Sequence, residues 1–127
     1  MRALVIDDSR AMRRIVSAAL EGFGYETRQA GHGQEALDVL QEGYVPDLCT
    51  IDWNMPVMDG LQFISAVRSS PAYRSIALMM VTTESETSQI VRALAAGAHE
   101  YMIKPFTADA MRDKLALLGL LPAEVSL

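Results

Sequence analysis

Five polar side chains of this 127-residue sequence stand at the ends of short apolar runs: Asp7, Asp8, Asp52, Thr82 and Lys104. Carboxylates with ordinary pKa values near 4 are ionised at neutral pH, so three of them brought close together repel one another or take up protons. A divalent cation removes that repulsion, and a set made only of oxygen ligands favours Mg²⁺ over Zn²⁺, which prefers His and Cys. A cation beside a lysine and a hydroxyl can hold the oxygens of a phosphoryl group, which a neighbouring carboxylate can attack as a nucleophile.

The residues between these groups predict alternating strands and helices. The run from Ala3 to Ile6 is apolar throughout, as in a buried strand, and apolar residues between 12 and 23 recur at three- and four-residue spacing, as on one face of a helix. The pattern repeats over four further pairs of segments: 26–30 with 33–41, 47–51 with 60–69, 77–82 with 86–96, and 100–103 with 108–118. Five such units predict an α/β doubly wound fold, in which right-handed crossovers build a parallel sheet with helices on both faces.

The residues at the predicted helix starts support these boundaries. Ser9, Asp59, Ser85 and Thr107 each precede a predicted helix, where a side-chain oxygen can accept a hydrogen bond from the first turn. Glycines follow the predicted helix ends, as expected where a residue with positive φ turns the chain back toward a strand.

The predicted topology brings the five polar residues together. Ligands of an open parallel sheet bind beyond the carboxyl ends of its strands, and four of the predicted strands end at these residues. Each acidic residue taken alone is better explained as part of a solvated turn or as a helix cap. Their joint placement on one edge of the sheet favours a cation site.

Composition limits the classes of protein that this chain can represent. Its length predicts one domain over residues 1–127, with a core over 3–119 and a short tail over 120–127. The 16 acidic residues outnumber the 11 basic ones, and this net charge of −5 argues against binding to nucleic acid or to anionic membranes. The single cysteine, Cys49, forms no intramolecular disulfide and is expected to be a buried apolar side chain. With no transmembrane span or signal peptide in its pattern, the chain is expected to be a cytoplasmic monomer.

The order and spacing of the polar residues resemble the motifs of response-regulator receiver domains. Those motifs are the acidic pair Asp7-Asp8, the run Asp52-Trp-Asn-Met-Pro-Val-Met-Asp-Gly60, the pair Val81-Thr82 and the run Tyr101-Met-Ile-Lys-Pro-Phe106. The resemblance covers residues 3 to about 119 and is strongest to the stand-alone chemotaxis regulators of the family. It implies the flavodoxin-like (βα)5 fold with strand order 2-1-3-4-5.

The resemblance also implies roles in phosphoryl transfer. Asp52 would accept a phosphoryl group from the phosphohistidine of a histidine kinase or a phosphotransfer domain, while Lys104 and Thr82 would bind the phosphoryl oxygens. The bond between Lys104 and Pro105 would be cis. Four ligands are implied for Mg²⁺, with Mn²⁺ as a substitute: Asp7, Asp8, Asp52 and the backbone carbonyl of Asn54.

A switch follows from the same resemblance. Thr82 would move onto the bound phosphoryl group and Tyr101 would swing inward behind it, which reshapes the face of the fourth helix, fifth strand and fifth helix for a downstream target. Asn54 and Glu84 flank the site and would tune hydrolysis of the acyl phosphate. A phosphatase is a further expected partner. The chain would therefore be a signalling switch with intrinsic autodephosphorylation and not an enzyme.

Two departures from the family pattern bear on this hypothesis. Thr83 stands where the family more often has a smaller residue, so its bulk narrows access to the phosphoacceptor and slows transfer. The segment 85–89 lacks the lysines expected of the chemotaxis members, which argues against binding to a flagellar motor switch but not against phosphoryl transfer. A relay or phosphate sink in another pathway is therefore the alternative.

Three other classes of protein match parts of the sequence less well. A phosphatase of the haloacid-dehalogenase type also uses an aspartate nucleophile, but Asn54, two residues after Asp52, cannot move a proton. A nucleotide or flavin binder is suggested by Gly31-His-Gly33-Gln-Glu-Ala36, although this pattern follows the second predicted strand instead of the first. A receiver that acts only as a binding module is disfavoured because the full set of site residues is present.

Overall fold

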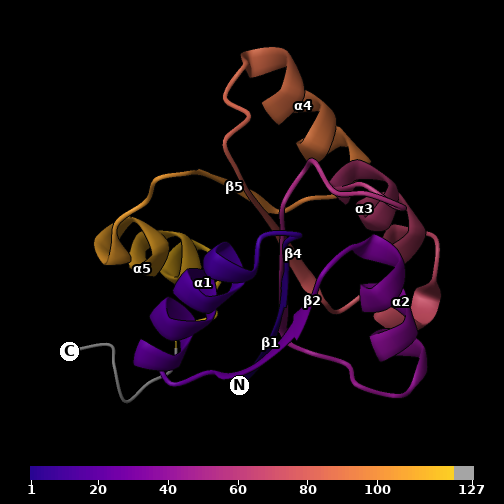
Figure 1. The fold of residues 1–127 in the computed structure, drawn as a ribbon, viewed down its shortest axis with the longest axis horizontal. Helices are drawn as coiled ribbons and strands as arrows, with labels where there is room; N and C mark the ends of the chain where they lie inside the picture. Colours follow the sequence, from indigo (N-terminus) through magenta and orange to yellow (C-terminus); the bar gives the residue numbers. More distant parts are fainter. Residues whose placement is uncertain (122–127) are drawn as a thin grey trace.

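The computed structural model describes residues 1–121, and strands alternate with helices along them (Figure 1). The elements in chain order are β1 (Arg2–Ile6), α1 (Arg10–Gly22), β2 (Glu26–Ala30), α2 (Gly33–Gln41), β3 (Leu48–Ile51), α3 (Gly60–Arg68), the 3₁₀ turn η1 (Pro71–Tyr73), β4 (Ala77–Thr82), α4 (Thr87–Ala96), β5 (Glu100–Ile103) and α5 (Ala108–Leu117). The predicted bounds of β2, β4, β5 and α2 are reproduced. The predicted tail falls partly outside the described residues, since 122–127 lie beyond them.

The strands form one parallel sheet in the order β2-β1-β3-β4-β5, which confirms the predicted flavodoxin-like fold. Its register places the last residues of neighbouring strands side by side: Ile6 pairs with Ile51, and Thr82 pairs with Ile103. Figure 1 shows α1 and α5 on one face of the sheet and α2, α3 and α4 on the other. The loops that follow β1, β3, β4 and β5 therefore open at a common edge.

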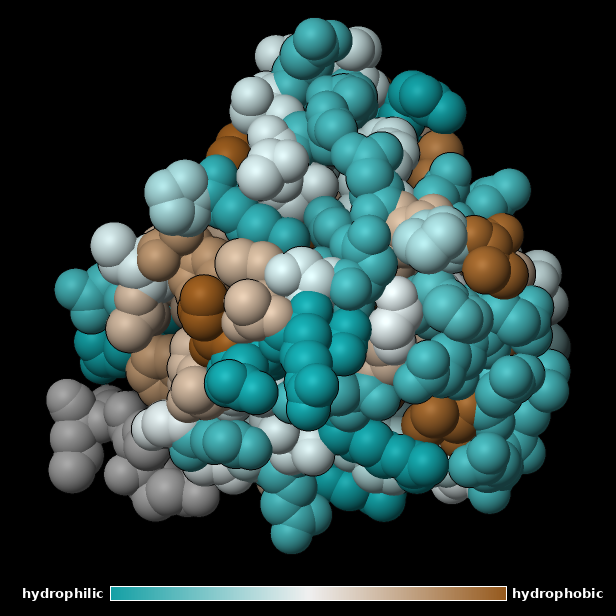
Figure 2. Space-filling view, in the orientation of Figure 1, coloured by the Kyte–Doolittle hydropathy of each residue, from teal (hydrophilic) through white to brown (hydrophobic). Residues whose placement is uncertain are grey.

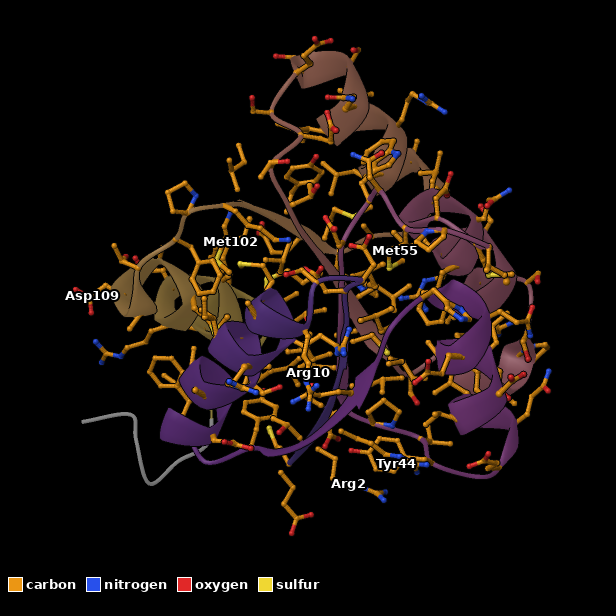
Figure 3. All side chains as sticks on the ribbon, in the orientation of Figure 1. Arg2, Arg10, Tyr44, Met55, Met102 and Asp109 are labelled. Carbon is orange, nitrogen blue, oxygen red and sulfur yellow. The ribbon has the colours of Figure 1, made fainter. Side chains whose placement is uncertain are left out.

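Alternating strand residues build a separate core on each face of the sheet. Leu4 and Ile6 of β1 pack with Phe63 of α3, whereas Ala3 and Val5 pack with residues of α1 and α5. Met79 and Met80 of β4 are fully buried, as their predicted role under the helices requires. In Figure 3, Met55 lies on the side of the sheet that α3 covers and Met102 lies on the side of α5. Because both faces are covered, the inner strands β1, β3 and β4 are largely apolar and buried, whereas the edge strand β2 is polar and mostly exposed.

The predicted caps are confirmed at three helices and wrong at one. The side chains of Ser9, Asp59 and Thr107 accept hydrogen bonds from the first turns of α1, α3 and α5. Ser85 is not the cap of α4, because that helix begins one residue later with Glu86 at the N-cap. The Glu86 amide donates to the Gln89 side chain at 3.4 Å, which sets the start of the helix.

Helix packing explains the pattern Gly31-His-Gly33-Gln-Glu-Ala36, which resembles a dinucleotide-binding fingerprint. A Cβ atom on Gly33 would lie 2.7 Å from Cγ of Met58, so only glycine lets the start of α2 approach the loop before α3 this closely. His32 caps α2, its Nδ1 accepting a hydrogen bond from the Glu35 amide at 3.1 Å. This segment therefore serves helix packing in the structure.

The remaining sequence-based expectations concern the interior and the membrane. Cys49 is a free thiol buried in the core, as predicted, and burial raises its pKa. Within residues 1–121, none of the helices has the length and apolar character needed to span a bilayer.

Candidate functional site

The predicted polar residues meet at the carboxyl edge of the sheet. Asp7 and Asp52 directly follow β1 and β3, Thr82 ends β4, and Lys104 directly follows β5. Asp7 and Lys104 are 97 positions apart in the chain, yet the Lys104 Nζ lies 2.6 Å from Oδ2 of Asp7. The structure thereby brings together residues from four strand ends.

The backbone around Asp52 is held by the strand before it and the helix after it. The Asp52 amide donates to the carbonyl of Ile6 at 2.9 Å, which extends the pairing of β3 with β1 by one residue. The chain then returns at once, because the Gly60 amide donates to the Trp53 carbonyl at 2.8 Å. A Cβ atom on Gly60 would overlap the carbonyl oxygen of Asp52, so glycine at this position is a condition for the placement of the carboxylate.

Asp7 is fixed by three contacts from different segments. Its Oδ1 accepts a hydrogen bond from the Ser9 amide at 2.9 Å, and its Oδ2 is paired with Lys104. Arg13 of α1 donates from Nη1 to the backbone carbonyl of Asp7 at 2.7 Å. Only 4% of the Asp7 side chain is exposed, so these bonds replace nearly all of its contact with water.

Lys104 is shared between two carboxylates. Its Nζ also lies 3.6 Å from Oδ1 of Asp52, and 9% of its side chain is exposed. The structure also confirms that the bond between Lys104 and Pro105 is cis. A buried ammonium in contact with two carboxylates is held by charge from both, and it cancels one of their two negative charges.

The three aspartates form a cluster that can hold a cation. Each of Asp7, Asp8 and Asp52 offers an oxygen atom within 4.8 Å of those of the other two. Opposite ligands of an octahedral Mg²⁺ lie about 4.2 Å apart, since each Mg–O distance is about 2.1 Å. The 4.8 Å limit is close to that separation, and the oxygen-only donor set with its net negative charge fits Mg²⁺. The role of the Asn54 carbonyl as a further ligand stays a prediction.

The electrostatic state of Asp52 follows from its surroundings. Burial raises the pKa of this carboxyl, the charge of Asp7 raises it further, and Lys104, the Thr82 hydroxyl and the Trp53 amide act in the opposite direction. Raising the pKa means that the ionised, nucleophilic form is disfavoured. A cation at the cluster would act in the same direction as Lys104 and restore that form.

Glu84 connects the site to α4 and β5. Its Oε1 accepts a hydrogen bond from the side-chain Nδ2 of Asn54 at 2.5 Å, and its Oε2 accepts one from the side-chain Nε2 of Gln89 on α4 at 3.0 Å. Its backbone amide donates to Oγ1 of Thr82 at 3.3 Å, and its carbonyl accepts from the Tyr101 hydroxyl at 2.6 Å. The two predicted switch residues are therefore both bonded to the backbone of Glu84.

Tyr101 is already turned inward in this structure. Its side chain packs in the core cluster on the side of α3, and 7% of the residue is exposed. Burial raises the pKa of its hydroxyl, and the charges of Glu84 and Asp52 raise it further. The phenol therefore stays a hydrogen-bond donor at neutral pH.

Two contacts at the site were missed from the sequence. Trp53, expected to be a loop aromatic, is only 8% exposed, and the guanidinium carbon of Arg92 on α4 lies 5.7 Å from its ring centroid. Gln89 was not recognised as a partner of Glu84. The approach of α4 to the loop after β3 creates the Arg92 contact, and no local spacing in the sequence signals it.

Comparison with known proteins agrees with this geometry. A family model described as the response regulator receiver domain matches residues 3–116. Chemotaxis protein CheY1 of Helicobacter pylori is 40% identical over 119 residues, which cover 93% of this chain and 96% of that protein. Chemotaxis protein CheY of Pseudomonas aeruginosa is 39% identical, over 91% of this chain and 93% of its own.

The fold is also shared with solved structures. The chemotaxis response regulator CheY4 of Vibrio cholerae aligns with a TM-score of 0.84 at 35% identity, covering 92% of this chain and 97% of the other. A putative response regulator from Chloroflexus aurantiacus aligns with the same TM-score at 28% identity and covers 94% of this chain. With its strand order, its cluster of acidic residues and a family model that matches nearly its whole length, the chain belongs to the family of response regulator receiver domains.

Proposed function

We propose that this chain is a CheY-like response regulator whose Asp52 accepts a phosphoryl group from the phosphohistidine of a histidine kinase or a phosphotransfer domain. The observation that carries the proposal is the position of Lys104, whose ammonium lies 3.6 Å from Asp52 and 2.6 Å from Asp7 beside the acidic cluster. A carboxylate oxygen of Asp52 attacks phosphorus, the bond from phosphorus to the imidazole nitrogen breaks, and that nitrogen keeps the electron pair.

The residues around Asp52 divide the tasks of binding and screening. Lys104 binds a phosphoryl oxygen and screens its charge, and the buried hydroxyl of Thr82 donates to a second oxygen. When bound by the three aspartates and the Asn54 carbonyl, Mg²⁺ supplies the positive charge that draws phosphate oxygens toward an acidic site. Mn²⁺ offers the same charge to the same oxygen ligands.

The output face in this proposal is formed by α4, β5 and α5. Thr82 and Tyr101 are linked through Glu84, whose carboxylate also holds Gln89 at the start of α4. A phosphoryl group on Asp52 draws Thr82 toward it and so favours one arrangement of this linkage. Because Tyr101 is already buried, phosphorylation stabilises its inward position and does not need to create it.

Exposed apolar residues on the same face support a protein partner there. Val91 and Leu94 of α4 are 57% and 45% exposed, and Ile103 of β5 is 40% exposed. Such residues favour binding to a partner whose surface covers them. The names of the relatives make chemotaxis the proposed pathway. A flagellar motor switch is the target that the resemblance to stand-alone chemotaxis regulators implies.

The signal ends when water attacks the acyl phosphate. Asn54 and Glu84, which are bonded to each other at the rim of the site, are the residues proposed to tune that hydrolysis, alone or with a phosphatase. In this proposal the protein is a cytoplasmic monomer that acts as a switch and not as an enzyme. A relay or phosphate sink in another pathway remains the second candidate, favoured by the absence of lysines in segment 85–89.

Intact mass spectrometry tests the central step. Incubation with Mg²⁺ and acetyl phosphate should add one phosphoryl group to the wild type and to Asp113→Asn, an exposed position on α5. Asp52→Asn should gain none. A wild type that stays unmodified with both acetyl phosphate and a phosphorylated kinase, or an adduct that persists in Asp52→Asn, contradicts the proposal.

A further inference from the structure

An apolar pocket of about 360 Å³ adjoins the phosphoacceptor site, between α1 and the loop that connects β5 to α5. Six residues line it: Met12, Ile15, Thr83, Lys104, Pro105 and Phe106. Figure 2 shows hydrophobic residues gathered over α1 and α5. Two lining residues belong to α1, and three belong to the loop that leads into α5. The volume equals that of roughly a dozen water molecules at about 30 Å³ each, so it can take several methylene groups.

The pocket and the site share a wall. Lys104 lines the pocket, while its ammonium contacts Asp7 and Asp52. Thr83 lines the pocket directly after Thr82, the last residue of β4. A molecule with a phosphoryl group at Lys104 can therefore place an attached apolar group in the pocket.

Resting on the proposed function, we propose that this pocket binds the acyl chain of small acyl phosphates and makes the protein prefer longer chains as phosphoryl donors. In the transfer, an oxygen of Asp52 attacks phosphorus and the bond from phosphorus to the bridging oxygen breaks. The acyl group leaves as a carboxylate with the electron pair, so one mixed anhydride replaces another and no co-reactant or proton is needed.

The chemistry of the lining selects this class of ligand. Lys104 offers a charge for the phosphoryl group, Thr83 contributes the one hydroxyl of the lining residues, and the other four side chains are apolar. Ile15 is 53% exposed and so presents a large apolar surface to a ligand. Each methylene group that the pocket removes completely from water raises the affinity by about fourfold, and partial burial gives less.

The test compares acetyl, propionyl and butyryl phosphate as donors. These three release carboxylates of nearly equal basicity, so differences in rate report contacts with the chain and not leaving-group strength. We expect the second-order rate constant, followed by the fluorescence of Trp53 and by intact mass at fixed Mg²⁺, to rise about fourfold or more from acetyl to butyryl phosphate.

Variants separate the pocket from general effects on the protein. Ile15→Gln should reduce the dependence on chain length to less than about twofold, because the polar side chain removes apolar surface from the pocket. Val45→Gln, an exposed apolar position before β3 and at the opposite edge of the sheet, should keep the wild-type dependence. Phosphoramidate, which has no apolar group, should phosphorylate wild type and Ile15→Gln at equal rates.

Each outcome has a defined meaning. Equal rates with all three acyl phosphates, or the same chain-length dependence in Ile15→Gln, overturn the pocket while leaving the phosphoacceptor proposal intact. No adduct with any donor overturns both. Self-association that rises with protein concentration in the wild type and is lost in Ile15→Gln assigns the pocket to a second copy of the chain and overturns the ligand proposal.

Discussion

Replacing Asp52 by asparagine should stabilise the metal-free protein while abolishing its proposed function as a phosphoacceptor. The pairwise charge interactions of this carboxylate nearly cancel. At an effective dielectric constant of about 20, repulsion from Asp7, whose oxygen lies within 4.8 Å, is at least about 3.5 kcal/mol, and attraction to Lys104 at 3.6 Å is about 4.6 kcal/mol. Exposed Asp8 adds about 0.9 kcal/mol of repulsion at the dielectric constant of water.

The cost of burying the charge of Asp52 then decides whether Asp52→Asn raises or lowers the free energy of unfolding. Only 12% of the Asp52 side chain is exposed, and burial is the largest cause of its raised pKa. Asparagine keeps an oxygen for the bond that the Trp53 amide donates at 2.9 Å but carries no charge to desolvate. We expect Asp52→Asn to raise the free energy of unfolding by about 2 kcal/mol, equivalent to about 8 °C in Tm for a chain of this length.

The assay is urea denaturation in EDTA at pH 7.5, followed by circular dichroism. Asp113→Asn, an exposed aspartate outside the cluster, is the control and should change stability by less than about 0.5 kcal/mol. Added Mg²⁺ should stabilise the wild type more than Asp52→Asn, because the variant has lost one anionic ligand. If Asp52→Asn is no more stable than the wild type in EDTA, the reasoning from burial and repulsion is refuted.

The raised pKa of Asp52 also makes the stability of the protein depend on pH. A carboxyl whose pKa is raised in the folded state binds more protons folded than unfolded, so its contribution to stability is lost as pH rises through that raised pKa. Without metal, the advantage of Asp52→Asn should therefore be largest at neutral pH and shrink as pH falls toward the ordinary carboxyl range near 4. An advantage that grows on acidification would contradict the sign of the shift.

Three further outcomes follow from contacts outside the acidic cluster. Asp59→Ala removes one half of the capping box with Gln62 at the start of α3. The free energy of unfolding, measured in urea, should fall by about 1 kcal/mol, and a decrease below about 0.3 kcal/mol would contradict a stabilising role of the cap. Arg92→Gln should shift the emission of Trp53 and lower stability by less than about 1 kcal/mol, and an unchanged spectrum would show that the guanidinium does not cover the ring in solution. Burial raises the pKa of Tyr25 to about 12 in the folded protein, whereas an exposed tyrosine titrates near 10. The folded state therefore loses stability as the pH rises from about 10 to 12. Tyr25→Phe should remove the last phase of an alkaline absorbance titration.

Much of the fold could be predicted from the sequence because its signals are local. The spacing of apolar residues depends only on the period of a helix or strand, and a cap depends on a side chain one turn away. Ser9, Asp59 and Thr107 were predicted on that basis and confirmed. The prediction for Ser85 was wrong because the local rule favours serine over glutamate, whereas in the structure Glu86 is the N-cap residue and its amide donates to the Gln89 side chain.

The set of polar residues that gather at the carboxyl edge follows from the amino-acid sequence, since parallel strands must end together once their order is set. The pairing among those residues depends on three-dimensional packing. That Lys104 lies closer to Asp7 than to Asp52 depends on the relative offset of two strand ends and on side-chain conformation. The contact of Arg92 with Trp53 depends on the angle at which α4 crosses the loop after β3. Such contacts join segments far apart in the chain, and packing fixes them to within an ångström, which residue periodicity does not encode.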